Sequence, residues 1–368
     1  MTKGRGLGYM LQLDSLRALA VAGVVVYHLG LARPWGTVRW GGAGVELFFV
    51  LSGFLITGIL LAARDKIESG RESRGGAVRL FYIRRFLRIF PIYYVTLAVV
   101  AGIGIGAARS TLPWHVAYLS NVYFARHGWN GAISHLWSLS VEEQFYLVWP
   151  WLILFLPRRM LPRAVVAAIA VGPLFRLACV IAGVNEIAIE VLPFGCLDLL
   201  GFGALLAYLR WSDTPLPRWL PAAAAMALVI AVGFEIARLY DVIVGPEIVS
   251  GRIARSLFFG WVVVRGADGF KGLGGAILSL RPLAAIGRIS YAIYLFHNFA
   301  NELAQKFFHY ALDRPYPDSI VAQRLITVGG TLAAAAVSWR YFEGPINRFK
   351  ERFHAGPPPH VEPAEVMR

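Results

Sequence analysis

Three ionisable residues, Asp14, Arg17 and His28, lie in the first segment that is long and apolar enough to cross a membrane, residues 11–31. A charged side chain at the centre of a bilayer costs roughly 2.5–3.5 kcal/mol, so such residues persist mainly where a helix bundle uses them. Arg17 and His28 are eleven residues apart, which places them within about 20° around a helix and about 16 Å apart along it. Asp14 precedes Arg17 by one turn. The spacing predicts a functional polar face, with a buried ion pair beside a packed histidine as the alternative.

A second group of candidates opens the segment 137–156. Glu142 and Glu143 are adjacent, so on a helix they point about 100° apart, and we expect at most one to face a given cavity squarely. Ser138 lies one turn before Glu142. Carboxylates here are suited to orient or charge-balance His28, as carboxylates do for catalytic imidazoles. The alternative is helix-start chemistry, in which serine caps the helix and acids occupy its first turn.

Arg85 and Arg88 are three residues apart and therefore neighbours on one helix face. Paired guanidinium groups offer several fixed donors and are typical of phosphate recognition. Taken alone, the pair is better explained as basic residues that anchor the cytoplasmic end of a membrane helix beside aromatic residues of the interface.

Glu46 in the second apolar segment and Tyr294 and His297 in the ninth are further polar candidates for contact with a substrate. A single intramembrane histidine is as compatible with packing as with binding. The chain has only two cysteines, Cys179 and Cys196, both in apolar segments. This pattern predicts neither a disulfide framework nor a metal site.

The composition places these candidates in a membrane. Of 368 residues, 57% are hydrophobic and 16% are charged, whereas soluble domains have about a quarter charged. We therefore predict an all-α, polytopic integral membrane protein with one membrane domain, residues 1–345, and a disordered cytoplasmic tail, residues 346–368. Apolar runs of about 20 residues predict ten spans, at 11–31, 43–63, 84–106, 137–156, 164–183, 192–209, 219–238, 243–264, 286–310 and 320–343.

Basic residues alternate between the connections. The net charge of +14 is therefore better explained by the positive-inside rule than by nucleic-acid binding. The basic side holds Lys3 and Arg5, the connection after the second span, and the tail, with Arg64, Lys66, Arg71, Arg74, Arg79, Arg348, Lys350 and Arg352. This alternation predicts that the N- and C-termini are cytoplasmic. Arg17 then lies toward the cytoplasm and His28 toward the outer face.

Six segments in order resemble acyltransferase family 3, the bacterial membrane acyltransferases that modify surface carbohydrates and some antibiotics. They are LDSLRALAVAGVVVYH, GVELFFVLSGFLI, RRFLRIFPIYY, HLWSLSVEEQFYLVWP, ISYAIYLFH and YFEGP, and they extend over residues 13–345. The family's arginine-x10-histidine motif falls on Arg17 and His28, and its arginine-x2-arginine motif on Arg85 and Arg88. Glu46 stands where the family usually has aspartate.

The resemblance implies a multi-pass protein of the bacterial inner membrane that uses cytoplasmic acyl-CoA, with acetyl-CoA favoured, and no metal. The acceptor is a hydroxyl of a surface, lipid-linked or otherwise glycosylated molecule. Arg85 and Arg88 would hold the CoA phosphates, and His28 would act as general base or form an acyl-histidine. Arg17, oriented by Asp14, would stabilise negative charge. Glu142 joins the catalytic candidates, and Glu46, Ser138, Glu143, Tyr294 and His297 are the candidates for substrate contact. An acyl relay to a partner enzyme and a transporter or flippase of lipid-linked sugar remain the alternatives.

Overall fold

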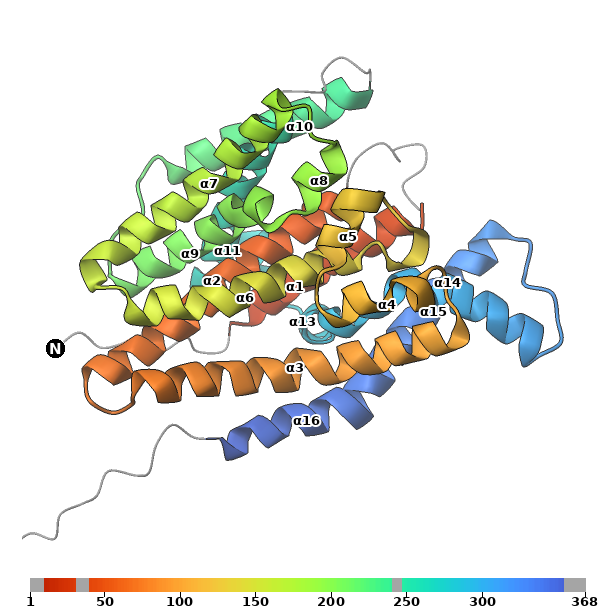
Figure 1. Ribbon diagram of the computed structural model, residues 1–368. Helices are drawn as coiled ribbons and strands as arrows, with labels where there is room; N and C mark the ends of the chain where they lie inside the picture. Colours follow the sequence, from red (N-terminus) through yellow and green to blue (C-terminus); the bar gives the residue numbers. More distant parts are fainter. Residues whose placement is uncertain (1–9, 31–39, 240–246, 354–368) are drawn as a thin grey trace, which may run out of the picture.

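A computed structural model describes residues 10–30, 40–239 and 247–353 (Figure 1). Every regular element in these ranges is helical, which confirms the predicted all-α class. The α-helices are α1 (Leu11–His28), α2 (Trp40–Glu68), α3 (Arg74–Ile103), α4 (Ala108–Val116), α5 (Ser120–His127), α6 (Leu136–Phe155), α7 (Leu161–Ile181), α8 (Glu186–Val191), α9 (Leu197–Trp211), α10 (Leu220–Leu239), α11 (Arg252–Asp268), α12 (Gly272–Leu278), α13 (Arg281–Arg288), α14 (Ser290–Tyr310), α15 (Ile320–Ser338) and α16 (Gly344–Phe349).

A long helix overlaps each of the ten predicted spans. Within the described part of the chain, six helical segments are long and apolar enough to cross a membrane by length and composition: 42–68, 74–103, 158–181, 193–211, 220–237 and 320–349. The helices α1, α6, α11 and α14 fall outside this set. Three of these four carry the candidate site residues, whose polarity lowers their hydropathy. The membrane class is therefore supported, and the number ten stays a prediction.

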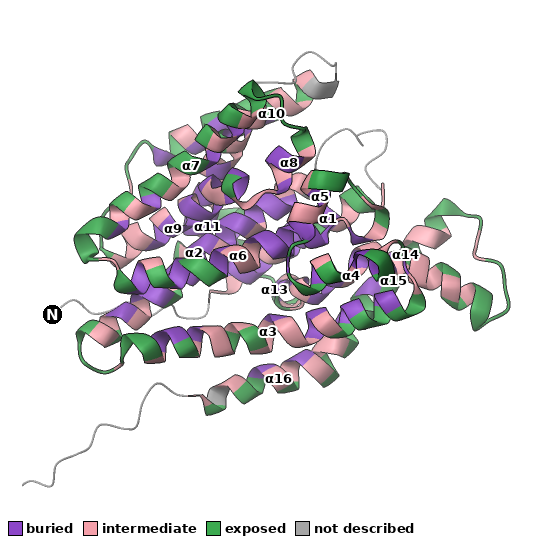
Figure 2. Ribbon diagram, in the orientation of Figure 1, coloured by how far each residue is buried: buried purple, intermediate pink, exposed green. Residues whose placement is uncertain are grey.

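Helix α2 is the centre of the bundle and packs against α1, α6, α9 and α11. In its most apolar stretch 72% of the residues are buried, against 17% for the segment that contains α7, and buried positions gather on the central helices in Figure 2. Two glycines let α2 and α9 meet backbone to backbone. A Cβ on Gly53 would lie 1.9 Å from the carbonyl oxygen of Leu200, and one on Gly203 would lie 2.0 Å from that of Val50.

The peripheral helices present apolar side chains outward. Leu174 on α7 is 63% exposed, Ile181 at its end 79%, and Val229 on α10 66%. A soluble protein rarely exposes such a continuous apolar surface. The hydrocarbon of a bilayer is the environment that suits these faces.

Three contacts fix which helix ends lie together. Gly44, near the start of α2, packs on Ala20 and Val24 of α1, so these two helices run antiparallel. Ser52 of α2 contacts Glu142 of α6. About three turns further along both helices, Arg64 of α2 donates to the carbonyl oxygen of Ile153 of α6. Helices α2 and α6 therefore run parallel. The end of α1 and the starts of α2 and α6 therefore share one end of the bundle, which we call the His28 end.

Helix α3 begins ten residues earlier than predicted, at Arg74. Ser73 caps it by accepting a hydrogen bond of 3.0 Å from the backbone N–H of Gly76. The extra turns contain two arginines and two glycines, which interrupt the apolar run that marked the predicted span. As a consequence Arg85 and Arg88 lie well inside a 30-residue helix rather than at its start.

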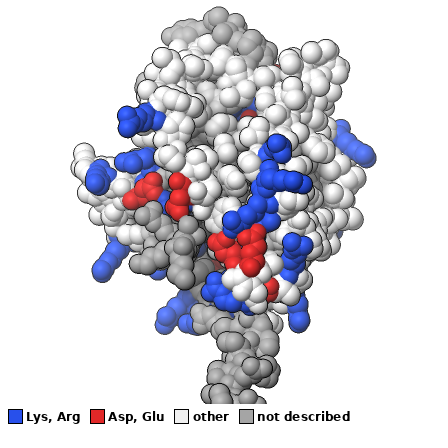
Figure 3. All heavy atoms as spheres, turned by 90° about the vertical axis from the view of Figure 1, so that its left-hand side faces the viewer, with Lys and Arg blue, Asp and Glu red and all other residues white. Residues whose placement is uncertain are grey.

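The end opposite His28 faces the viewer in Figure 3, which shows Lys and Arg side chains spread around it and interrupted by groups of Asp and Glu. Lys3 and Arg5, which contributed to the predicted orientation, lie outside the described residues. Of the predicted tail, residues 346–352 continue α16 and a short 3₁₀ turn, and residues 354–368 lie outside the described part.

Candidate functional site

A cavity opens between five helices. Its empty volume is about 710 Å³, the open space at its mouth included. Polar side chains from all five helices line it: Arg17 from α1, Ser52 from α2, Arg85 and Arg88 from α3, Ser138, Glu142, Glu143 and Tyr146 from α6, and Ser290, Tyr291 and Tyr294 from α14.

The arginines give this cavity a cationic wall. Arg17 forms an ion pair of 3.0 Å with Asp14, which lies outside the lining and fixes Arg17 from behind. The guanidinium of Arg85 lies 4.7 Å from the ring centre of Tyr146. Arg85 and Arg88 form no hydrogen bond or ion pair with any described residue. Their N–H groups are therefore available to an anionic ligand.

The two glutamates both line the cavity, whereas the sequence predicted that only one would face it squarely. Glu142 accepts a hydrogen bond from the hydroxyl of Ser52, which in turn accepts one of 3.1 Å from the hydroxyl of Tyr146. Because adjacent helical side chains point about 100° apart, the cavity extends over a wide part of the α6 surface. Three arginines therefore face two glutamates across the cavity, which leaves basic side chains in excess.

His28 lies beside this cavity in a group of three imidazoles, His28, His135 and His297, which we call the histidine cluster. Ring centres are 4.9 Å apart for His28 and His297 and 5.0 Å apart for His135 and His297. His135 and His297 are buried, and His28 is exposed at the end of α1. The cluster therefore leads from the protein interior to the surface at the His28 end.

Hydrogen bonding assigns the tautomer of His28. Its Nδ1 lies 2.9 Å from the carbonyl oxygen of Val24, which can only accept, so Nδ1 carries the proton and Nε2 keeps its lone pair. In the same way Nδ1 of His297 donates to the carbonyl oxygen of Tyr294 at 2.6 Å. The bare Nε2 of His297 then lies 3.3 Å from Nδ1 of His28 and shares its proton. His28 is thus arranged with its basic nitrogen directed away from these contacts.

Tyr294 joins the cluster to the cavity. Its hydroxyl bonds to that of Ser138 and donates to the carbonyl oxygen of His135 at 3.0 Å, while its ring centre lies 5.5 Å from that of His297. Tyr294 and Ser138 both line the cavity. One side chain therefore separates the cavity from the imidazoles.

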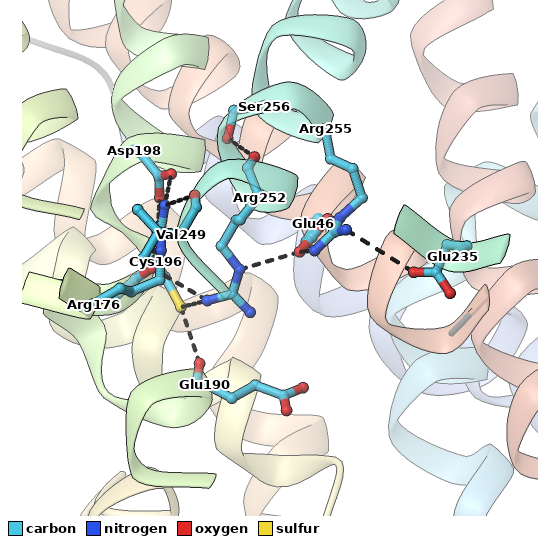
Figure 4. Close-up of polar contacts among 11 residues, drawn as sticks. Glu46, Arg176, Glu190, Cys196, Asp198, Glu235, Val249, Arg252, Arg255 and Ser256 are labelled. Carbon is cyan, nitrogen blue, oxygen red and sulfur yellow. Dashed lines mark hydrogen bonds and ion pairs between the residues drawn. The ribbon is translucent and has the colours of Figure 1, made fainter. Parts of the chain in front are cut away.

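Glu46 does not line this cavity. Its carboxylate is buried and bonded to Arg252 Nε at 3.1 Å and to Arg255 Nε at 2.6 Å (Figure 4). These partners begin α11 and line a second, smaller pocket at the His28 end. Both carboxylate oxygens accept hydrogen bonds from arginines, so Glu46 holds Arg252 and Arg255 in place.

A comparison with protein families supports this arrangement of motifs. A family model described as an acyltransferase domain matches residues 10–341. The chain belongs to acyltransferase family 3. The match covers α1 to the turn that follows α15 and so includes every helix that contributes to the cavity and to the histidine cluster.

Relatives within acyltransferase family 3 carry informative names. The chain is 30% identical to the peptidoglycan O-acetyltransferase OatA of Listeria monocytogenes over 366 residues, which cover 92% of this chain and 56% of that protein. It is 29% identical to the O-acetyltransferase OatA of Staphylococcus aureus, with 92% and 57% covered. The chain thus spans a little over half the length of these relatives. No solved structure matches it.

The structure brings together seven of the predicted site residues at the cavity: Arg17, Arg85, Arg88, Ser138, Glu142, Glu143 and Tyr294. It places Asp14 behind Arg17, His28 and His297 in the histidine cluster, and Glu46 in the second pocket. The expected carboxylate partner of His28 is absent among the described residues, and His297 takes that position.

Four polar side chains that line the cavity, Ser52, Tyr146, Ser290 and Tyr291, were not among the predicted site residues. Tyr146 follows Glu142 by one helical turn, so the spacing of Ser138, Glu142 and Tyr146 was the available signal. Ser52 stood out only through its glycine neighbour, and its hydrogen bonds to α6 depend on packing between helices. Within the described ranges, no group of three His, Cys, Asp or Glu side chains is arranged to hold a metal ion.

Proposed function

We propose that this protein is a membrane O-acyltransferase that moves an acyl group, acetyl in the first instance, from acyl-CoA to a hydroxyl of a carbohydrate. The observation that carries the proposal is the cavity itself, where unpaired guanidinium groups share a lining with Tyr294, which contacts the histidine cluster in which His28 keeps a free basic nitrogen. Membership of acyltransferase family 3 and the names of the relatives support the reaction class.

The cationic wall is suited to the donor. The nucleotide end of acyl-CoA carries phosphates, and the free N–H groups of Arg85 and Arg88 offer charge-assisted hydrogen bonds to them. Arg17, fixed by Asp14, adds a third positive charge and is suited to stabilise a phosphate or developing negative charge. From these arginines the pantetheine arm extends past Glu142 toward Ser138 and Tyr294, which brings the thioester to the histidine cluster.

His28 then acts as general base. As the acceptor hydroxyl oxygen attacks the thioester carbonyl carbon, its proton passes to Nε2 of His28 and the new C–O bond forms. The C–S bond breaks, and the departing thiolate takes the proton from His28 and leaves as CoA. The carbonyl oxygen of Val24 and Nε2 of His297 hold the Nδ1 proton throughout, which keeps the reactive tautomer in place. An acyl-histidine intermediate on the same nitrogen uses the same geometry.

The orientation of the protein in the membrane follows from the predicted positive-inside topology. Both termini are cytoplasmic, the donor enters from the basic end, and His28 meets the acceptor at the outer face of a bacterial inner membrane. The relative from Listeria monocytogenes is named as a peptidoglycan O-acetyltransferase, so the glycan of peptidoglycan is the first acceptor to offer.

The experiment offers radiolabelled acetyl-CoA to the purified protein in liposomes, together with peptidoglycan fragments, lipid-linked oligosaccharides and other surface glycans. The proposal predicts label on a glycan hydroxyl and release of CoA. If the protein binds acetyl-CoA tightly but label reaches a glycan only after a second protein is added, the protein is an acyl relay and does not transfer the acyl group directly. A failure to bind acetyl-CoA, with transport of a lipid-linked sugar, would overturn the proposal in favour of a flippase.

A further inference from the structure

Arg85 contacts an aromatic ring although two carboxylates share its cavity. Its guanidinium carbon lies over the ring of Tyr146, 4.7 Å from the ring centre. Glu142 and Glu143 line the same cavity, and the charge of Arg85 acts on both of them. Among the described residues, neither glutamate forms an ion pair with Arg85. Carboxylates are the usual partners of a buried guanidinium, so the unpaired state of Arg85 needs a physical cause.

We propose that Tyr146 is a positioning residue for the donor. Its ring holds Arg85 away from Glu143, so that N–H groups of Arg85 stay free for a phosphate of acyl-CoA. The proposal rests on the proposed function, because this phosphate belongs to the donor of that reaction.

The two possible partners of Arg85 differ in the groups they use. A carboxylate binds a guanidinium through its N–H groups, often two at once, and these are the groups that bind phosphate. An aromatic ring attracts the positive charge through its π-electrons and leaves N–H groups available. Contact with Tyr146 therefore stabilises Arg85 in the cavity, whereas an ion pair with Glu143 would compete with the ligand.

Tyr146 is itself held in place. It is only 4% exposed, and its hydroxyl donates a hydrogen bond of 3.1 Å to the hydroxyl oxygen of Ser52 on α2. Ser52 in turn donates to the carboxylate of Glu142. This chain of hydrogen bonds fixes the ring of Tyr146 and gives Glu142 a partner other than Arg85.

Glu143 is the remaining carboxylate, and it has no hydrogen-bond or ion-pair partner among the described residues. It lies three residues before Tyr146 on α6, which makes the two side chains neighbours on the helix surface. The charge of Arg85 acts on both. If the ring is removed, Arg85 can therefore turn to Glu143 by a change of its own side chain, without a movement of the helices.

The first test separates the ring from the hydroxyl. Tyr146→Leu removes both, and Tyr146→Phe keeps the ring. The Kd values of acetyl-CoA and of acetyl-pantetheine, which lacks the nucleotide phosphates, are measured by equilibrium dialysis in detergent. Tyr146→Leu should raise the Kd of acetyl-CoA about tenfold or more, as expected for the loss of one charge-assisted hydrogen bond, and leave that of acetyl-pantetheine unchanged. Tyr146→Phe should bind both donors nearly as the wild type does.

Phe155→Leu is the matched control. Phe155 ends the same helix, and its ring centre lies 5.6 Å from the guanidinium carbon of Arg74. Neither residue lines the donor cavity. The control thus removes a ring beside an arginine away from the cavity, and it should bind both donors as tightly as the wild type.

A second substitution tests the competition with Glu143. In a Tyr146→Leu, Glu143→Gln double variant, the charge that would capture Arg85 is absent, so the Kd of acetyl-CoA should return toward the wild-type value. A role of the ring in packing alone would leave the double variant as weak as the single one. Glu143→Gln alone should bind acetyl-CoA more tightly than the wild type, because it removes a negative charge beside the phosphate site.

The outcomes distinguish this proposal from the proposed function. An unchanged Kd of acetyl-CoA in Tyr146→Leu, an equal loss for acetyl-pantetheine, or no recovery in the double variant would overturn the role of Tyr146 while acetyl-CoA binding by the wild type still stands. Weaker acetyl-CoA binding by Glu143→Gln would overturn the role of Glu143 as competitor even if Tyr146→Leu does not fold. A wild type that binds no acetyl-CoA would overturn the proposed function and this inference with it.

Discussion

Replacing Arg88 by alanine is expected to weaken acetyl-CoA binding selectively. Arg88 lines the cavity beside Arg85, and neither guanidinium is bonded to a described protein group, so the substitution breaks no hydrogen bond or ion pair of the free protein. The substitution should therefore raise the Kd for acetyl-CoA and leave the stability of the fold unchanged. Arg84 is adjacent on the same helix and exposed, and Arg84→Ala removes the same charge as a matched control.

The magnitude follows from the contacts that Arg88 can offer. A hydrogen bond to a charged group contributes about 1.5–3 kcal/mol, and each 1.4 kcal/mol corresponds to a tenfold change in affinity. Loss of one such contact to a CoA phosphate therefore predicts a Kd raised by roughly 10–150-fold. Arg85→Ala should have a comparable effect, with the additional loss of its contact with Tyr146.

The assay compares two donors in detergent by equilibrium dialysis. Acetyl-CoA carries the nucleotide phosphates, whereas acetyl-pantetheine carries the same thioester and arm without them. Arg88→Ala should weaken only acetyl-CoA, and Arg84→Ala should weaken neither. Equal losses for Arg84→Ala and Arg88→Ala, or an equal loss for acetyl-pantetheine, would refute the assignment of the cationic wall to phosphate.

Two further substitutions distinguish a residue that stabilises the fold from a residue that assists the reaction. Arg176→Met should destabilise the protein by about 3–5 kcal/mol, because it leaves Asp198 buried without the two hydrogen bonds of 2.7 and 2.9 Å that it now accepts. Thermal unfolding in detergent measures this loss of stability. An Arg176→Met, Asp198→Leu double variant is expected to regain stability, because no buried charge is left unpaired. An unchanged melting temperature in the single variant would disprove the prediction. His297→Phe keeps a ring but removes the acceptor near Nδ1 of His28, so kcat should fall about 2–10-fold with KM for acetyl-CoA unchanged. A wild-type kcat would show that Val24 alone holds the tautomer.

Much of this site follows from helical spacing. The eleven-residue interval between Arg17 and His28 placed both on one side of α1, and the three-residue interval between Arg85 and Arg88 placed both on one side of α3. Such intervals survive folding because a helix fixes the relative direction of its own side chains. The all-α class followed from composition in the same direct way.

Contacts between helices could not be predicted from the spacing of residues along a single helix. The place of Glu46 depends on Arg252 and Arg255, some 200 residues away, and the partner of His28 is His297 rather than a carboxylate. Both depend on which helix faces meet, which local spacing does not encode. The start of α3 was missed for another reason, because arginines and glycines in its first turns interrupt the apolar run, while the cap by Ser73 depends on local geometry.

The measurement that tests the account most directly is acetyl transfer by His28→Ala under conditions where acetyl-CoA binding is measured on the same sample. His28 lies outside the cavity lining, so the variant should bind acetyl-CoA with wild-type affinity. Without the base, transfer should fall by about 10²–10⁴-fold. Transfer at the wild-type rate, in a variant that still binds acetyl-CoA, would contradict the proposed mechanism.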